Sequence, residues 1–95
     1  MEDQFYIIRA DRAGVFFGKI NQRNGGEAVL TDVRRIWYWE GAASLSQLAV
    51  DGTCAPWGCK FTVVVPEMIV RGIIEIIPCT AKAVESIMAV PEWKA

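Results

Sequence analysis

The stretch "VFFGKINQRNGGEAVLTDV" (residues 15–33) predicts two β-strands joined by a tight turn. Its arms, residues 15–20 and 27–33, are typical strand sequences, and Asn24-Gly25 between them is the strongest short hairpin signal in the chain. A type I′ turn needs positive φ at both central residues, which asparagine and glycine accept readily. Gly18 interrupts the first arm and indicates a bulge or a close contact there. The stretch therefore predicts an antiparallel hairpin.

Further strands are predicted on both sides of this hairpin by short runs rich in apolar and β-branched residues: 5–10, 34–40, 61–65 and 68–77. The run at 34–40 follows the hairpin almost without a break, so we expect a kink near Asp32. Pro66 is expected to end the strand before it, because proline cannot donate to a central ladder. Arg71-Gly72 divides the last run into one broken strand or two.

Two short helices are predicted by capping signals. Ser44 followed by Gln47 fits a capping box, and Asp51-Gly52 supplies a stop after about two turns. Thr80 is expected to cap a second helix, which Pro91 closes. The apolar face predicted for that second helix consists of Ala83, Val84, Ile87 and Met88.

The sequence as a whole predicts one α+β domain over residues 1–95: a mostly antiparallel, curled β-sheet with two short helices, and a tail at 91–95. A chain of 95 residues leaves no room for a second domain. Its composition, 53% hydrophobic, is rich for so small a domain. We therefore predict a homo-oligomer whose interface takes up the surplus apolar surface; the alternative is a tight alanine- and valine-rich core in a monomer.

The charge pattern gives no reason to expect duplex nucleic acid or a membrane as partner. The net charge is −1, and the ten basic and eleven acidic residues are spread along the chain. The acidic start, "MEDQFYIIRAD", lacks the basic and then apolar layout of a signal peptide. No apolar run approaches the roughly 20 residues that span a bilayer. A soluble, cytoplasmic protein is the expectation.

Missing residues exclude the commonest catalytic classes. The chain has no histidine, so a Ser-His or Cys-His nucleophilic pair is impossible. No phosphate-binding glycine loop, dinucleotide fingerprint or metal-ligand spacing is present. A cysteine activated by a lysine, or a carboxylate pair, is the alternative. We predict a protein that is not an enzyme and has no cofactor or metal.

The three cysteines, an odd count, indicate free thiols in a reducing compartment. Cys54 and Cys59 flank "APWG", a wider spacing than that of the usual zinc knuckle. A disulfide or a metal site between these two is the lesser alternative to structural or incidental thiols. Cys79 stands alone, directly after Pro78.

Candidate ligand-binding residues concentrate in "RRIWYWEGAASLSQLA" (34–49). Guanidinium and indole groups together suit a flat anionic ligand, because rings stack on bases and arginine binds phosphate through two parallel hydrogen bonds. Side chains alternate along a strand, which places Arg35, Trp37 and Trp39 on one face. Arg34, Ile36 and Tyr38 share the other face, so both faces carry a cation and large rings.

The glycine turn after this strand is predicted to add anion-binding donors. Gly41 opens toward a helix N-terminus with free N–H groups, and Ser44 and Ser46 could add hydroxyl donors. Trp57, in the loop between the first two cysteines, is predicted to be a lid over the site or an anchor in a neighbouring subunit. For the whole set the alternative is core or subunit packing, with Ser44 as a simple cap and the arginines paired with acids.

Three segments carry a family resemblance: "AGVFFG" (13–18), "VRRIWYWEGAASLSQLAVDG" (33–52) and "EIIPCTAKAVESI" (75–87), together with Cys59-Lys60-Phe61 after a proline. They resemble a family of short proteins found mainly in phages and prophages and carried as a domain of unknown function. The likeness covers about residues 5–90, and the 34–49 block is its most specific part. The resemblance implies no assigned activity.

By genomic setting and size, the resemblance implies a small protein that acts by binding in the host cytosol. Such proteins block a host protein or sequester a nucleotide signal of host defence, often as oligomers. The leading interpretation is a non-enzymatic, oligomeric sponge for a small nucleotide-like anionic ligand. The alternatives are a protein–protein interaction module, directed at a host or virion protein, and a structural phage component without a small-molecule ligand.

Overall fold

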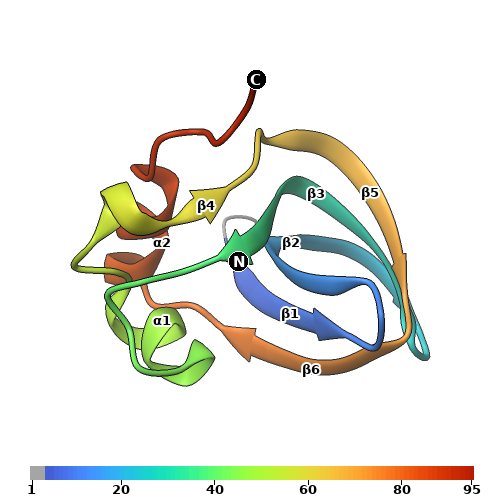
Figure 1. Cartoon of the computed structure of the whole chain (residues 1–95). Coiled ribbons are helices and arrows are strands. Elements are labelled where there is room, and N and C mark those ends of the chain that lie inside the picture. Colours follow the sequence, from blue (N-terminus) through green and yellow to red (C-terminus); the bar gives the residue numbers. More distant parts are fainter. Residues whose placement is uncertain (1–3) are drawn as a thin grey trace.

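An antiparallel sheet of six strands, with two helices against one of its faces, is the architecture of the computed structural model, which describes residues 4–95 (Figure 1). The strands are β1 (Tyr6–Ala10), β2 (Gly14–Asn24), β3 (Glu27–Tyr38), β4 (Lys60–Phe61), β5 (Val65–Arg71) and β6 (Ile73–Pro78). The helices are α1 (Leu45–Asp51) and α2 (Ala81–Met88), with a 3-10 turn, η1 (Pro56–Gly58), between α1 and β4. The predicted α+β fold is confirmed.

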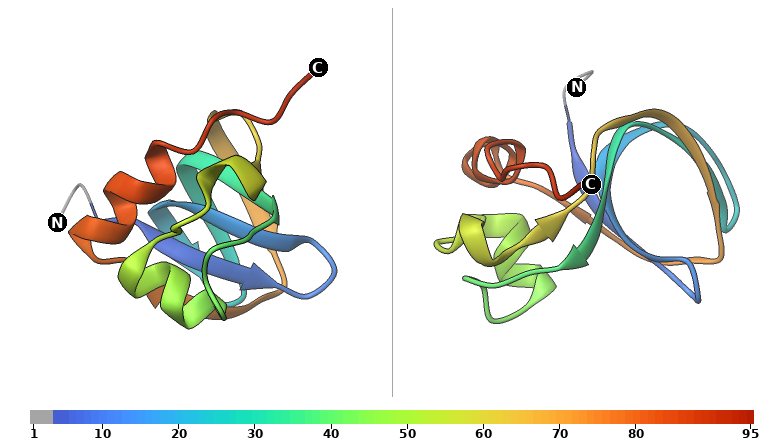
Figure 2. Two further views of the ribbon diagram at one scale, coloured as in Figure 1. Left: turned by 60° about the vertical axis from the view of Figure 1, so that its left-hand side comes forward. Right: turned by 45° about the horizontal axis from the view of Figure 1, so that its top comes forward.

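The sheet curls until its two ends meet at a corner. The strand order is β4-β3-β2-β1-β6. β5 pairs with the first part of β3, residues 27–33, and β4 pairs with its end, at Ile36 and Tyr38. Figure 2 (right) shows β5 and β6 joined at the corner, which Gly72 forms with φ +77°. The Gly72 carbonyl accepts a hydrogen bond from the Asp11 N–H at 2.7 Å, which ties the corner to the β1–β2 turn. The run at 68–77, predicted as one broken strand or two, therefore belongs to two strands, β5 and β6.

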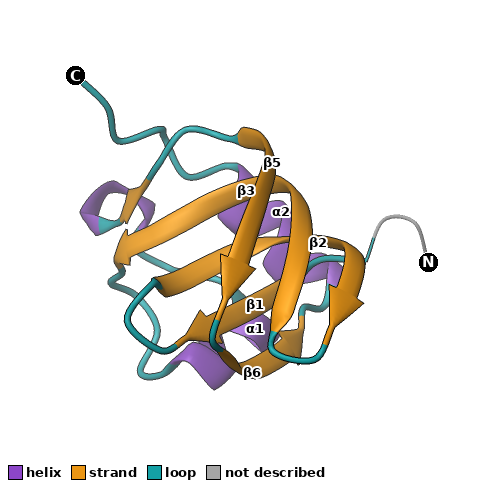
Figure 3. Cartoon of the chain, turned by 90° about the vertical axis from the view of Figure 1, so that its right-hand side faces the viewer, coloured by secondary structure: helices purple, strands orange, loops and turns teal. Residues whose placement is uncertain are grey.

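Strand alternation divides the apolar side chains between the two faces of the sheet. Ile8 and Phe16 point into the curl, whereas Ile7 and Phe17 point toward the helices. The inner core is the buried set within the curl: Ile8, Ala10, Phe16, Ala28, Leu30, Val33 and Val70. The helix-side core is the buried set beneath the helices, which lie behind the sheet in Figure 3: Phe5, Ile7, Phe17, Ile36, Leu48, Ala49, Cys59, Phe61, Cys79, Ala83, Ile87 and Val90.

The predicted hairpin is present, but its turn lies one residue further along the chain. Asn24 and Glu27 are the last paired residues of β2 and β3, so Gly25 and Gly26 are the central residues of the turn. Gly25 has φ +62°, whereas neither Asn24 nor Gly26 has a positive φ. A positive φ at the first central residue only is the pattern of a type II′ turn, which prefers glycine there. The predicted type I′ turn on Asn24-Gly25 is therefore wrong.

The kink expected near Asp32 and the close contact expected at Gly18 are both confirmed, and they coincide. Asp32 has φ +52°, and the β2–β3 register shifts at this point so that β3 carries one extra residue. Gly18 lies opposite this bulge, where an added Cβ would come within 3.2 Å of the Thr31 carbonyl oxygen and of Val33 Cα. The glycine thus lets the two strands approach closely where the sheet bends.

Pro66 does not end a strand that begins at residue 61, and this prediction is wrong. β4 comprises only Lys60–Phe61, and Pro66 is the second residue of β5. Within the described residues β5 pairs with β3 alone, so one of its sides has no ladder to complete. Proline is tolerated on such an edge strand because its missing N–H removes no ladder hydrogen bond there.

Both predicted helix caps are confirmed. Ser44 Oγ accepts a hydrogen bond from the Gln47 N–H at 3.1 Å, and Gln47 Oε1 accepts one from the Ala43 N–H at 2.7 Å. Thr80 Oγ1 accepts one from the Ala83 N–H at 3.1 Å. The Gln47 and Ala83 N–H groups are backbone donors that a helix leaves free at its first turn, whereas Ala43 lies just before the cap of α1.

The C-terminal part differs from the prediction in two respects. Met88, expected on the apolar face of α2, is 45% exposed, because the helix ends there, after its last buried position at Ile87. The expected tail at 91–95 is docked over part of its length. Glu92 forms a β-bridge with Phe61, and the Trp93 N–H donates to the Phe61 carbonyl at 2.9 Å.

Candidate functional site

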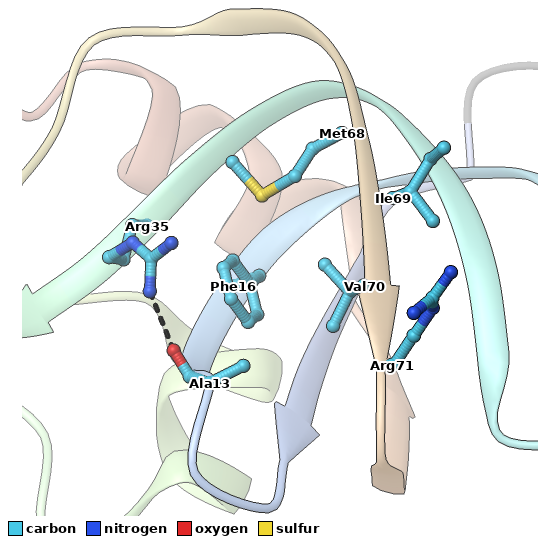
Figure 4. A pocket seen from close by; sticks show the side chains of 7 residues that line it. All are labelled: Ala13, Phe16, Arg35, Met68, Ile69, Val70 and Arg71. Carbon is cyan, nitrogen blue, oxygen red and sulfur yellow. Dashed lines mark hydrogen bonds between the residues drawn. The ribbon is translucent and has the colours of Figure 1, made fainter.

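A cavity of about 480 Å³ opens at the mouth of the curled sheet, and Arg35 lines it (Figure 4). The other lining residues come from the β1–β2 turn and from strands β2 and β5: Ala13, Phe16, Met68, Ile69, Val70 and Arg71. Met68 and Val70 point into the curl, whereas Ile69 and Arg71 point to the other side of β5 (Figure 4). Because residues of both faces line it, the cavity lies against the free edge of β5.

Arg35 presents to this cavity a guanidinium that is hydrogen-bonded through one of its three nitrogens. Its Nη1 donates to the Ala13 carbonyl at 2.6 Å, and its Cζ lies 4.7 Å from the centroid of the Phe16 ring. Within residues 4–95, Arg35 forms no ion pair, and Nε and Nη2 have no hydrogen-bond acceptor. Two N–H-bearing nitrogens are therefore available to an acceptor that enters the cavity.

A second cation stands at the rim of the same cavity. The Arg71 side chain is 82% exposed, and its Nε lies 3.6 Å from Glu27 Oε1. So exposed a pair is weak, because water screens both charges. Arg71 can therefore turn from Glu27 toward an anion without a large loss.

Arg34 is the most deeply buried charged residue in the described part of the chain, with 1% of its surface exposed. Its guanidinium donates to the carbonyls of Ile87 at 2.7 Å, Thr62 at 2.9 Å and Phe61 at 3.1 Å. A longer bond reaches Pro91. Burial lowers the pKa of Arg34, and the surrounding carbonyls offset this cost of desolvation. The prediction that Arg34 binds a ligand does not fit this placement; the residue joins α2 to β4.

The predicted sharing of one face by Arg35, Trp37 and Trp39 is wrong, because β3 contains a second bulge. Ile36 pairs with Phe61 and Tyr38 with Lys60, which leaves Trp37 as an extra residue. The alternation of side chains breaks there. Trp39 packs against the helix-side core and donates from Nε1 to the Ala42 carbonyl at 3.2 Å. Trp37 is 63% exposed.

The predicted anion turn at Gly41 packs against its own chain. Gly41 has φ +83° and accepts a hydrogen bond from the Cys54 N–H at 3.3 Å. Ser44 Oγ is occupied by the helix cap, and Ser46 is exposed on α1, away from the residues that line the cavity. The Gly41 turn and the N-terminus of α1 thus make hydrogen bonds that stabilise the fold.

Trp57 lies at the tip of the η1 loop with 86% of its surface exposed, as expected of a loop aromatic. It does not line the Arg35 cavity. Of the residues predicted from the sequence, the cavity therefore includes Arg35 alone. Phe16, Met68 and Arg71 were missed because only the curl of the sheet brings their strands together.

The cysteines are free thiols with different exposure: Cys54 is exposed, whereas Cys59 and Cys79 are buried. Cys59 Sγ lies 3.4 Å from the Glu40 carbonyl oxygen and 3.6 Å from that of Ala55, so it packs as a weak donor. Burial raises the pKa of Cys79 to about 12.

Native protein is expected to react with a thiol-specific disulfide reagent at one fast site, Cys54, because the thiolate is the reactive form and needs access. Cys59 and Cys79 should react only after unfolding in guanidinium chloride. The released chromophore, followed with time and assigned by peptide mass, measures this. Fast modification of Cys79 in the native state would contradict the assignment.

The described residues contain neither a metal-binding cluster nor a membrane-spanning helix. Among the described residues, no group of three or more histidine, cysteine, aspartate or glutamate side chains is placed to hold a metal ion. No helix in residues 4–95 has the length and apolar character needed to cross a membrane.

Comparisons with known proteins give one match. Neither a curated protein nor a solved structure matches the chain. A family model described as "Domain of unknown function (DUF6948)" matches residues 4–87, and the chain therefore belongs to that family.

Proposed function

We propose that the protein binds rather than reacts, and that its ligand is a small, nucleotide-like anion held in the Arg35 cavity. The observation that supports this most directly is a partly buried guanidinium, fixed over Phe16, with no acidic partner among the described residues. Arginines without a carboxylate at the mouth of a cavity favour anions, because the guanidinium fork matches phosphate and carboxylate geometry.

The walls of the cavity complement the uncharged part of such a ligand. Phe16, Met68 and Val70 supply an apolar surface beside the guanidinium. A planar ring could stack on the open face of Arg35, since guanidinium groups stack on aromatic rings. The volume, about 480 Å³, lies in the range of sites that hold small molecules.

The family resemblance adds a context to this proposal. A short phage or prophage protein that captures a nucleotide without turnover would act in the host cytosol as a sponge against a defence signal. Capture without turnover is consistent with a chain that has no histidine to act as a general base.

Thermal unfolding against a panel of mono-, di- and cyclic nucleotides tests the proposal. A ligand at about 100 times its dissociation constant adds about 2.7 kcal/mol, which raises the melting temperature of a domain of this size by about 10 °C or more. Calorimetric titration of the best hit should then show that Arg35→Ala weakens binding by about 10- to 100-fold.

Arg23→Ala is the matched control, because Arg23 is an exposed arginine outside the cavity whose Nε donates to the Gly25 carbonyl at 3.3 Å. It should leave binding unchanged although it removes the same charge. Full binding by the Arg35→Ala variant, or an equal loss in both variants, would overturn the site. A panel without any shift would overturn the ligand class and favour a protein–protein role.

A further inference from the structure

Trp37 and Trp93 form a stacked pair on the surface, apart from the Arg35 cavity. Their ring centroids lie 6.0 Å apart with an interplanar angle of 17°. Even so, Trp37 remains 63% exposed and Trp93 45% exposed. Neither residue lines the Arg35 cavity. Large indoles that stay this open after stacking on each other mark an interaction surface.

The backbone presents this pair in a fixed position. Trp37 is the extra residue of the second bulge in β3, a device that re-aims one side chain. Trp93 is held by the hydrogen bond from its N–H to the Phe61 carbonyl, next to the Glu92 bridge. Lys60 Nζ lies 5.4 Å from the centroid of the Trp93 ring. Little side-chain ordering therefore remains to oppose binding.

We propose that this surface binds a second copy of the chain, with the free face of Trp37 in each copy stacked on that of the other around a two-fold axis. Four indoles would then form one continuous stack. A two-fold interface uses the same patch on both copies, so the patch must be complementary to itself.

The charges around the pair meet this requirement. Tyr38, next to Trp37, lies opposite Lys60 in the β3–β4 register and donates from its hydroxyl to Glu40 Oε2 at 2.9 Å. Lys60 and Glu40 thus flank the aromatic side chains. The two neighbours of Trp93, Glu92 and Lys94, form an ion pair at 3.4 Å. A two-fold axis can bring the lysine of each copy toward the glutamate of the other, whereas a patch of one sign would repel itself.

The exposed area predicts a weak dimer. At about 200 Å² for a whole aromatic side chain, the open parts of Trp37, Tyr38 and Trp93 amount to about 310 Å². A stable interface buries about 800 Å² on each partner. The aromatic patch supplies less than half of that, so the dimer should depend visibly on protein concentration.

Pairing of sheet edges is a less suitable route to the same dimer. β5 carries Pro66, and β6 contains an extra residue, Ile74, where its register with β1 shifts. Proline and bulges both obstruct strand addition. The stacked tryptophans have no such obstruction.

Light scattering coupled to size exclusion, over about three decades of protein concentration, tests the proposal. We expect the mass of the wild type to rise from one chain toward two, and the Trp37→Ala variant to stay at one chain throughout. Trp57→Ala is the matched control: it removes a more exposed tryptophan, at 86%, that has no ring contact within the described residues. It should dimerise like the wild type.

Charge reversal gives a second, independent readout. Lys60→Glu and Glu40→Lys should each weaken self-association, and an equimolar mixture of the two variants should restore a dimer, because each interface contact regains opposite charges. Unchanged melting temperatures and anion binding in these variants separate this surface from the Arg35 cavity. A wild type of one chain at every concentration, a dimeric Trp37→Ala variant, equal loss in Trp57→Ala, or a mixture that stays monomeric would each overturn the proposal.

Discussion

Arg34→Ala is expected to lower the free energy of unfolding by about 4 kcal/mol. The substitution removes three short hydrogen bonds to the carbonyls of Thr62, Phe61 and Ile87. The Phe61 and Ile87 carbonyls keep one backbone donor each, whereas the Thr62 carbonyl has no other donor among the described residues. The substitution also opens a cavity at a position with 1% exposure. Loss of this one side chain removes the hydrogen bonds that join the last turn of α2 to β4. Equilibrium unfolding in urea, monitored by tryptophan fluorescence, measures the change.

Arg35→Ala is the matched control, since it removes the same side chain one position along β3. Arg35 is only partly buried and bonds a single carbonyl, that of Ala13, so we expect a loss of about 1 kcal/mol. If the Arg34 variant lost no more stability than the Arg35 variant, the carbonyl cluster would not be the structural centre that its geometry indicates.

Gly41→Ala is expected to cost about 4 kcal/mol or to prevent folding, because two independent effects add at this position. Its φ of +83° disfavours any side chain. An added Cβ would lie 2.5 Å from the Ala55 backbone N and 2.7 Å from that of Cys54, and closer still to Thr53 Oγ1. Backbone atoms cannot move aside as a flexible side chain can. Thermal and urea unfolding both report the loss.

Gly25→Ala separates the two effects. Gly25 has a similar φ of +62°, but nothing lies within 4 Å of an added Cβ. The cost there should be the backbone term alone, about 1 to 2 kcal/mol. Equal losses at both glycines would mean that the loop from Thr53 to Ala55 yields easily. Movement of this loop would then expose the Gly41 turn, where the sequence alone predicts anion-binding donors.

Much of the fold could be predicted from sequence because its signals are local. The caps at Ser44 and Thr80 involve side chains that bond backbone groups three residues away. The hairpin and the kink at Asp32 also depend on consecutive residues, so their existence could be predicted, although the predicted turn type was wrong. Glycines next to one another can share a turn in more than one register.

The site could be predicted only in part because its geometry depends on distant segments. Arg34 and Arg35 are adjacent and identical, and both faces of β3 meet apolar cores, so nothing local decides which arginine is buried. The extra residue at Trp37 exists only through pairing with the two-residue strand β4. Because that bulge reverses the alternation, Trp39 turns to the helices instead of joining Arg35.

The proline in the edge strand β5 also bears on how the chain behaves when crowded. Fibrils grow when the open side of one sheet accepts an identical strand from the next molecule. Pro66 interrupts the donors along that side, and the extra residue in β6 disturbs the register at the opposite end of the sheet. A chain that is half hydrophobic thus carries an obstruction to strand addition at both ends of its sheet.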